Sequence, residues 1–453
     1  MRYSSARYAA IETLQLLGNK HTPLPIIFEQ VCQRQHLKGP DRALAMNLIY
    51  GVLRNYQYLE RLMALLCSQP LKKLHPTVFQ ALAVGLYQIF FLSRIPPSAA
   101  VNETVEAARA ARIPTRLIGF VNGVLRQSIR RQQALPQPGE PGDDGRPIYN
   151  HPSWLIRRWL ARFGRQETEA ICRSNNERQP LTLRLTALSP GRNEYIARLT
   201  AIGIDARCGD YAPDAVVLDN FHGGIDTLPG YHHGHFQVQG EAAQLCTLLL
   251  QPSVRDGRWL DACAGVGGKS RHLLELIDHL HGRLVAVEPQ PHRQKMFREN
   301  MAAAKMEKRC LLFPGSLEQY AAGNSQKFDG ILVDAPCSGT GVLGRQPDIR
   351  WRRQPEDICR YAARQRQLLR LAARLLRPEG VLVYATCSLE VEENDEVVSS
   401  FLEENSTFQL SDSGLYLPQT ADPLVRDQYF QPRPSEGIDG FFAARLVCNI
   451  SDD

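Results

Sequence analysis

Two cysteines in this chain follow hydrophobic runs that are typical of buried strands. Residues 331–341 read Ile-Leu-Val-Asp-Ala-Pro-Cys-Ser-Gly-Thr-Gly, so a strand would deliver Asp334 and Cys337 onto a loop rich in proline and glycine. Residues 383–388 read Val-Tyr-Ala-Thr-Cys-Ser, so a second strand would deliver Cys387 to its end. A thiolate is a strong nucleophile, so this pattern indicates covalent catalysis by a cysteine with an acid nearby.

The other cysteines indicate no comparable chemistry. The chain has eleven cysteines, an odd number without clustered spacing and without a C-x-x-C pair. This argues against a disulfide framework and a structural zinc site, so we expect no bound metal in a protein of a reducing compartment. Cysteine is most often a small buried hydrophobe, which is our interpretation of Cys32, Cys67, Cys172, Cys246 and Cys310.

A glycine-rich turn precedes both cysteine motifs. Residues 260–269 read Leu-Asp-Ala-Cys-Ala-Gly-Val-Gly-Gly-Lys and run from a predicted strand into a predicted helix over 270–277. Glycines let a backbone approach a ligand closely, and Glu288, which ends the next strand, suits the two ribose hydroxyls of an adenosyl cofactor. From these residues alone NAD, S-adenosylmethionine and a turn without a ligand all stay open, because the spacing is neither G-x-G-x-x-G nor Walker A.

These motifs need a scaffold that brings them to one place. From about residue 239 the chain alternates short β-rich runs with amphipathic helical patterns, which predicts an α/β fold with a mostly parallel sheet. Ligands bind at the carboxyl ends of the strands in such sheets, so the glycine turn and both cysteines should converge there. The strand candidates are residues 259–262, 283–287, 330–333 and 381–385.

The first third of the chain predicts an all-helical domain that binds a polyanion. Over residues 1–133 apolar residues recur at intervals of three and four, and strand-like alternation does not occur. Residues 1–131 carry 17 Lys and Arg against 6 Asp and Glu, whereas the remainder is net acidic. This uneven charge favours nucleic acid as a partner, with a solvated basic surface as the alternative.

Changes in composition divide the chain into three predicted domains. Residues 135–147 concentrate proline, glycine and acids, which predicts a linker, and residues 181–238 mix strand and helix signals. We therefore predict a helical domain at 1–140, a linker with a small α+β subdomain at 141–235, and an α/β domain at 236–449.

No segment of the sequence predicts export or a membrane span. The first ten residues lack the apolar core of a signal peptide. The most apolar stretch, residues 79–92, is interrupted by Gln80, Gly85 and Gln88. It is shorter than the roughly 18 residues of a membrane span, so it predicts a buried helix. We expect a cytoplasmic protein that does not bind membranes.

The two cysteine motifs together resemble one family. D-A-P-C-S-G-T-G at 334–341, followed by A-T-C-S at 385–388, is similar to the RsmB/NOP class of RNA (cytosine-5) methyltransferases. The first third resembles the NusB-type helical RNA-binding domain that is fused to the bacterial 16S ribosomal RNA enzyme of this class. Its matching segments are 41–44, 50–54 and 121–126. Further segments resemble the middle region and last sheet motif of that enzyme, namely 151–154, 175–176 and 440–442.

The resemblance implies a mechanism and a cofactor. Cys387 is implied to attack C6 of cytosine so that C5 can accept a methyl group, and Cys337 is implied to help release the product. Asp334 is implied to hydrogen-bond the N3 and amino edge of the base, with Lys269 close to the cytosine. The implied cofactor is S-adenosyl-L-methionine, in a Rossmann-like class I methyltransferase domain. The residues expected to hold it are Cys263, Ala264, Gly265, Val266, Gly267, Gly268, Lys269, Glu288, Ser316 and Asp334.

The implied substrate is RNA, with 16S ribosomal RNA favoured by the NusB-type domain and DNA not expected. The target base must leave any stack to reach a pocket, so single-stranded or loop RNA is the natural substrate. The family places a basic and aromatic stretch similar to residues 345–351 next to the target nucleotide, while packing of Trp351 in the protein is the alternative. We expect a monomer.

The cofactor pocket departs from the family pattern at three places. Gly265-Val266 and Ser270 stand where the family has Ala-Pro and Thr. Ser316 occupies the position of an acid that normally contacts adenine, and Gly240 replaces the acid of a Gln-Asp pair. None of these positions is a cysteine, so the departures predict weaker cofactor binding with intact chemistry.

Three other functions stay open. The same chemistry on transfer RNA would use the same motifs. An RNA-binding or ribosome-assembly protein that keeps the fold without the chemistry would also explain the basic helical domain and the altered cofactor turn. An NAD-dependent oxidoreductase is the most distant alternative, because no residues suited to hydride transfer accompany the glycine turn.

Overall fold

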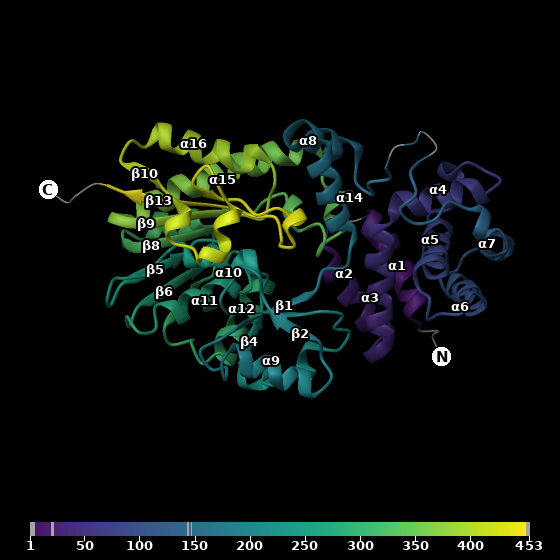
Figure 1. The fold of residues 1–453 in the computed structure, drawn as a ribbon, viewed down its shortest axis with the longest axis horizontal. Coiled ribbons are helices and arrows are strands. Elements are labelled where there is room, and N and C mark those ends of the chain that lie inside the picture. The colour runs from purple at the N-terminus through teal and green to yellow at the C-terminus, as the bar shows by residue number, and fades with distance from the viewer. Residues whose placement is uncertain (1–4, 20–21, 143–144, 146, 450–453) are drawn as a thin grey trace. The chain divides into compact units, whose positions relative to one another are not determined.

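The computed structural model describes residues 5–19, 22–142, 145 and 147–449. These residues group into two compact units, which Figure 1 shows as a purple to blue helical part and a teal to yellow part with sheets. The helical unit comprises residues 1–177 together with 346–352, and the second unit comprises residues 178–345 and 353–453.

The helical unit is built from helices whose apolar sides share one core. Helix α5 (Pro76–Phe91) is buried along most of its length, and Leu48, Val52 and Val121 of helices packed against it lie in the same core. Burial of these side chains stabilises helices that would be marginal alone. The remaining helices are α1 (Ala6–Asn19), α2 (Leu24–Gln35), α3 (Gly39–Arg54), α4 (Tyr56–Leu66), α6 (Pro97–Ala110), α7 (Thr115–Arg130), α8 (Ser153–Asn176) and the short α14 (Ile349–Arg352).

The all-helical prediction for the first third of the chain is therefore confirmed. Residues 79–91 of the apolar stretch lie in α5, at the centre of the helical core. Across the part of the chain that the structure describes, no helix has the length and apolar character that crossing a membrane requires.

The second unit begins with a small antiparallel sheet of four strands. Its order is β2-β3-β1-β4, and helix α9 (Arg192–Ala201) packs on it through Tyr195 and Leu199. The strands are β1 (Leu181–Leu185), β2 (Ala206–Cys208), β3 (Ala215–Leu218) and β4 (Phe236–Val238). The predicted α+β character is confirmed, although β2 and β4 have only three residues each and give no alternation that a sequence could display.

The rest of the second unit is organised around a nine-stranded sheet. Its order is β11-β12-β13-β9-β8-β5-β6-β7, with β10 paired to β13. Neighbouring strands from β9 to β7 are parallel, whereas β13 runs antiparallel to β9. The strands are β5 (Arg258–Asp261), β6 (Arg283–Val287), β7 (Cys310–Phe313), β8 (Phe328–Asp334), β9 (Leu376–Thr386), β10 (Phe408–Ser411), β11 (Val425–Arg426), β12 (Tyr429–Phe430) and β13 (Phe442–Cys448).

Helices cover both faces of this sheet (Figure 1). Successive strand residues face opposite ways, so Leu332 and Val383 lie in one apolar core and Val333 and Tyr384 in the other. Burial on both faces explains the continuous apolar runs of the sequence and confirms the predicted α/β fold. One face is covered by α10 (Glu241–Leu248), α11 (Gly268–Leu276) and α12 (Pro291–Ala303), and the other by α13 (Leu317–Gly323), α15 (Pro355–Leu375) and α16 (Asp395–Glu404).

Candidate active site

The cysteines of the two sequence motifs lie at the same edge of the large sheet. Strands β8 and β9 are adjacent and parallel, and Asp334 is opposite Ala385 in their register. Cys337 lies three residues beyond the end of β8, and Cys387 follows β9 directly. The Sγ atoms of the two cysteines are 3.1 Å apart. The structure thus brings together the two thiols that the sequence predicts to converge.

Hydrogen bonds hold the two cysteine loops against each other. The Gly341 N–H donates to the Cys387 carbonyl at 3.0 Å, and the Leu389 N–H donates to Thr340 Oγ1 at 2.9 Å. The Gly341 carbonyl in turn accepts from the Gly440 N–H at 2.8 Å. A β-carbon at position 341 would clash with the Gly440 carbonyl, so only glycine permits this close crossing of backbones.

An ion pair joins the glycine-rich turn to the first cysteine motif. Lys269 Nζ lies 2.7 Å from Asp334 Oδ2, and the two side chains are 13% and 31% exposed. Burial alone would lower the pKa of Lys269, but the Asp334 carboxylate, with Cys246 and Cys387, raises that pKa above its ordinary value. The ammonium also lies 5.0 Å from the centre of the Phe441 ring. Lys269 therefore keeps a positive charge near Cys387.

The surroundings of Cys337 disfavour its thiolate form. Its hydrogen bond with Cys387 raises the pKa of Cys337 well above the ordinary value, and burial and the negative charges of Cys387 and Glu393 act in the same direction. Two thiolates 3.1 Å apart would repel each other strongly. Cys337 therefore stays protonated while Cys387 lies beside it.

The glycine-rich turn follows β5, the neighbour of β8 in the sheet. Gly265 and Gly267 have φ angles of 57° and 91°, where an L side chain would be strained. The Gly267 N–H donates to the Ala264 carbonyl at 2.9 Å, and Asn300 Nδ2 donates to the Val266 carbonyl at 2.7 Å. These bonds hold the part of the turn in which glycine and valine replace alanine and proline.

Asp261, the last residue of β5, is a site residue that the sequence analysis missed. Its carboxylate accepts from the Cys263 N–H at 3.3 Å and from Ser270 Oγ at 2.6 Å, so it ties together the two ends of the turn. Burial raises the pKa of Asp261 to about 6. Ser270 supplies the hydroxyl that a threonine would supply, so this departure preserves the bond. The position of Asp261 at the carboxyl end of a strand is the signal that could have identified it.

Ser316 and Gly240 have local structural roles. Ser316 caps helix α13, because its Oγ accepts from the Gln319 N–H and its own N–H donates to the Gln319 side chain. A β-carbon at position 240 would lie 2.5 Å from the Asp439 carboxylate, and Asp439 pairs with Arg345 at 2.7 Å. An aspartate at position 240 would place a second carboxylate there, so the glycine suits the Arg345–Asp439 pair.

The residues around the turn suit an adenosyl cofactor. Glu288 follows β6, is 3% exposed, and accepts from the Gln290 N–H at 2.7 Å through one of its carboxylate oxygens. A carboxylate accepts hydrogen bonds and the two ribose hydroxyls can donate them. A β-carbon at Gly265 would meet no atom within 4 Å, so the turn is open at this position. The residues present therefore fit the cofactor that the sequence predicts.

Part of the basic and aromatic stretch after Cys337 belongs to the helical unit. Arg350 is 1% exposed and donates to the Asn150 carbonyl at 2.9 Å. Trp351 Nε1 donates to the Leu53 carbonyl at 2.8 Å, and its ring centre lies 4.9 Å from that of Tyr56. The packing alternative is therefore the correct one for Trp351, and Arg350 is a buried structural residue.

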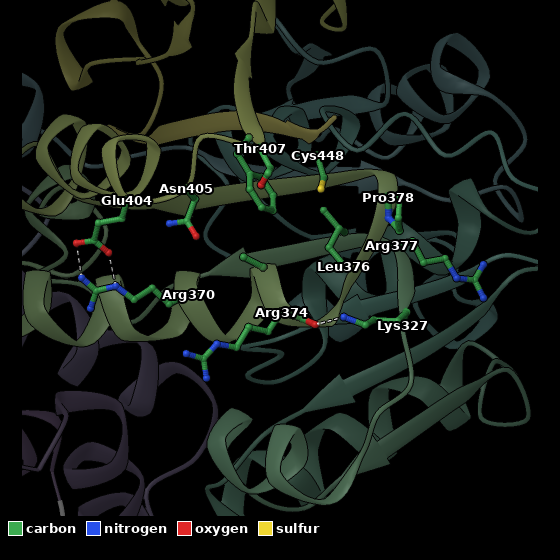
Figure 2. Close-up of a pocket in the computed structure, with 12 residues that line it drawn as sticks. Lys327, Arg370, Arg374, Leu376, Arg377, Pro378, Glu404, Asn405, Thr407 and Cys448 are labelled. Atoms are coloured by element: carbon green, nitrogen blue, oxygen red, sulfur yellow. Dashed lines mark hydrogen bonds and ion pairs between the residues drawn. The ribbon is translucent and has the colours of Figure 1, made fainter. Parts of the chain in front are cut away.

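A cavity of about 910 Å³ lies at the opposite edge of the large sheet, where β8 and β9 begin. Figure 2 shows that Lys327, Arg370 and Arg374 line it, with Arg370 paired to Glu404 and Lys327 donating to the Arg374 carbonyl. None of the predicted site residues lines this cavity. It is therefore separate from the candidate active site at the carboxyl ends of the strands.

Three segments of the chain match known families. Residues 4–130 match the NusB family, and residues 151–223 match the ferredoxin-like domain of RsmF/B-like methyltransferases. Residues 247–447 match the family described as 16S rRNA methyltransferase RsmB/F. The helical domain is thus NusB-like, the small middle domain is ferredoxin-like, and the large sheet belongs to a methyltransferase domain.

Curated relatives match nearly the whole chain. "Probable ribosomal RNA small subunit methyltransferase B" of Bacillus subtilis is 35% identical over 99% of both chains. "Ribosomal RNA small subunit methyltransferase B" of Klebsiella pneumoniae is 37% identical over 96% of this chain and 95% of its own. The crystal structure of PH0851 shares the fold, with a TM-score of 0.78 and 24% identity over 97% of this chain and 98% of its own. The chain therefore belongs to the RsmB/F family of 16S rRNA methyltransferases, whose cofactor is S-adenosyl-L-methionine.

Proposed function

We propose that this enzyme methylates carbon 5 of a cytosine in 16S ribosomal RNA and that Cys387 is its nucleophile. The observation that carries the proposal is the 3.1 Å separation of the Cys337 and Cys387 sulfur atoms at the carboxyl edge of the sheet. A single thiol could be a buried hydrophobe, but two thiols beside the Lys269–Asp334 ion pair form an arrangement suited to covalent chemistry. The RNA class follows from the family and from the relatives, which are named as methyltransferases of the small ribosomal subunit RNA.

Cys387 acts first in the proposed reaction. Carbon 5 of cytosine is too weak a nucleophile to take a methyl group unaided. The Cys387 thiolate adds to C6, so an S–C6 bond forms and the electrons of the C5=C6 bond make C5 nucleophilic. Asp334 hydrogen-bonds the N3 and amino edge of the base, and Lys269 adds positive charge nearby. S-adenosyl-L-methionine, when bound, supplies the electrophilic methyl group that C5 receives. Its site comprises the glycine-rich turn, Glu288 and Ser316.

Cys337 acts second, and the charge coupling of the pair sets this order. While Cys387 is free, its hydrogen bond and negative charge keep Cys337 protonated. Once the Cys387 sulfur is bonded to C6 it is neutral, so both of these effects disappear and Cys337 can release its proton to solvent. Cys337 then accepts the proton from C5, and the electrons of the C5–H bond reform the C5=C6 double bond. The S–C6 bond breaks at the same time, and the electrons of that bond restore the Cys387 thiolate.

Bisulfite sequencing of ribosomal RNA from cells with and without the gene tests the proposal. Bisulfite spares 5-methylcytosine, so we expect one 16S position to read as cytosine only when the gene is present. A gene-dependent cytosine in transfer RNA, and none in 16S RNA, would show the same chemistry on another substrate. No gene-dependent position in any RNA would favour a protein that holds RNA without methylating it.

A further inference from the structure

A buried carboxylate, Glu393, lies behind the cysteine pair and has no part in the proposed chemistry. It closes the short 3-10 turn Val391–Glu393, which lies between β9 and α16, and it is fully buried. Burying a carboxylate costs free energy unless hydrogen bonds compensate for the lost water. The partners of Glu393 therefore indicate what its burial achieves.

The Glu393 carboxylate is bonded to the residue after each cysteine. Its Oε2 accepts from the Ser338 N–H at 2.8 Å, and its Oε1 accepts from Ser388 Oγ at 2.7 Å. Ser338 follows Cys337, and Ser388 follows Cys387. The two serine hydroxyls also lie 3.0 Å from each other. One carboxylate therefore ties the backbone of the first cysteine loop to a side chain of the second.

Helix α15 and strand β9 hold Glu393 in place. Gln365 Nε2, on α15, donates to Glu393 Oε2 at 2.9 Å and to the Pro336 carbonyl at 3.0 Å. The Tyr384 hydroxyl, on β9, donates to the Glu393 carbonyl at 2.5 Å. We call Glu393 and its hydrogen bonds to the two cysteine loops the brace. Gln365 and Tyr384 are fully buried, so the brace is fixed to the core of the domain rather than to solvent-exposed loops.

We propose that Glu393 is a positioning residue that keeps the Cys337 and Cys387 sulfur atoms adjacent, by binding both cysteine loops through one buried carboxylate. This inference rests on the proposed function for its catalytic meaning, but the adjacency of the sulfur atoms can be measured without any RNA.

The charge of Glu393 has a second, separable effect, because it acts on Cys337. Its carboxylate is one of the groups that raise the pKa of the Cys337 thiol, after the hydrogen bond with Cys387 and burial. Glutamine at position 393 has the same shape as glutamate but no charge. Its amide oxygen can accept from Ser338 and Gln365, and its NH₂ can donate to the Ser388 hydroxyl, which can reorient. The titratable and charged groups around Cys337 are Cys387, Glu393, Tyr361 of α15, Tyr384 of β9, and Arg353, which donates to the Ser338 carbonyl.

Diamide oxidation of the purified protein measures the adjacency directly. Two neighbouring thiols lose two protons and two electrons to form a disulfide while diamide is reduced to its hydrazide, and peptide mapping identifies the Cys337–Cys387 link. We expect Glu393→Ala to slow this link by about tenfold or more and to lower kcat by about 100-fold, with KM for the cofactor within about twofold. Glu393→Gln is expected to form the disulfide within about twofold of the wild-type rate.

The effect of the Glu393 charge on Cys337 is measured in the Cys387→Ala variant, because Cys387 no longer influences Cys337 there. There Glu393→Gln is expected to shift the iodoacetamide profile of Cys337 to lower pH. Glu396→Gln, an exposed carboxylate three residues further along, is the matched control and should change nothing. If Glu393→Ala fails to fold, Ser388→Ala breaks the same brace from the other side and is expected to slow both diamide linking and turnover by about tenfold.

The inference would be overturned if folded Glu393→Ala, or Ser388→Ala, formed the Cys337–Cys387 disulfide at the wild-type rate and had the wild-type kcat. An unchanged Cys337 profile in the Glu393→Gln variant would overturn its electrostatic part. If the wild-type enzyme makes no 5-methylcytosine, the proposed function fails, yet the diamide rates still decide whether Glu393 positions the two sulfur atoms.

Discussion

The sulfur atoms of Cys337 and Cys387 lie 3.1 Å apart although 50 residues separate them in the sequence. The parallel register of β8 and β9, which pairs Asp334 with Ala385, brings them to the same height at the edge of the sheet. At this distance the hydrogen bond and any negative charge on Cys387 raise the pKa of Cys337. Their order of action in the proposed reaction follows from that effect.

Cys337→Ala should trap the enzyme on its RNA. Without Cys337 the C5 proton is not removed, so the Cys387–C6 bond persists after methyl transfer. Incubation with S-adenosyl-L-methionine and unmethylated 16S RNA should then give a covalent complex that survives a denaturing gel. The double variant Cys337→Ala, Cys387→Ala is the control and should give no complex, whereas a complex that persists in the double variant would contradict the assignment of Cys387.

Ser316→Asp should tighten cofactor binding. Aspartate caps helices as well as serine does, so the first turn of α13 is expected to keep its capping bond. The new carboxylate supplies the acid that the resemblance implies at this position, and a charged hydrogen bond should improve the affinity by about fivefold, or about 1 kcal/mol. Isothermal titration with S-adenosyl-L-methionine measures this. Ser325→Asp, in the loop after α13, is the control, and equal affinities of all three proteins would refute the role of position 316.

Asp261 should make the stability of the protein pH-dependent. Burial raises the pKa of Asp261 from 3.8 to about 6. Between these values the folded protein keeps a proton that the unfolded chain has released, so this residue lowers the free energy of unfolding as the pH rises through that window. In Asp261→Asn the amide oxygen can accept from the Cys263 N–H and the amide NH₂ can donate to Ser270 Oγ. The variant does not titrate, so the fall in the free energy of unfolding between pH 4 and pH 7 should be smaller by up to about 3 kcal/mol. Urea unfolding from pH 4 to pH 7 measures it.

The matched control for this experiment is Asp422→Asn, which changes an exposed carboxylate of the same domain. It should leave the pH dependence of unfolding as in the wild-type protein. Parallel curves for the wild-type protein and Asp261→Asn would mean that the Asp261 carboxyl does not titrate differently in the folded state.

Gly341→Ala should destabilise the domain and impair catalysis together. The added methyl group would push against the Gly440 carbonyl and crowd the Cys387 carbonyl, so the backbone at the cysteine site must shift. Overpacking of this kind costs about 1 to 3 kcal/mol. Chemical denaturation and methyl-transfer assays measure the two effects. Gly323→Ala, at an uncrowded position in α13, should leave both unchanged or raise stability slightly.

The sequence predicts the scaffold well where local signals are strong. The strands that carry Asp334, Cys337 and Cys387 are continuous apolar runs because both faces of the sheet are covered, and such runs are visible without a structure. The helical first third follows from its three-to-four spacing. By contrast, β11 and β12 have two residues each, which is too short for any alternation to mark them in the sequence. The predicted domain boundaries stay predictions.

The site was predictable only in the residues that carry obvious chemistry. Asp261 escaped prediction because its importance comes from burial and from its bond to Ser270. Glu393 escaped prediction because its importance comes from burial and from partners distant in sequence, such as Gln365. Trp351 was ambiguous for the same reason, since its hydrogen bond to Leu53 spans nearly 300 residues. The structure supplies these long-range partners, which composition and spacing do not encode.

The most direct test of the central claim is a methyl-transfer assay with the single variant Cys387→Ala. Unmethylated 16S RNA is incubated with S-adenosyl-L-methionine that carries a labelled methyl group, and the digested nucleosides are identified by mass spectrometry. We expect labelled 5-methylcytidine with the wild-type enzyme and none with the variant, which should still bind the cofactor. Labelled 5-methylcytidine formed by Cys387→Ala would contradict the account.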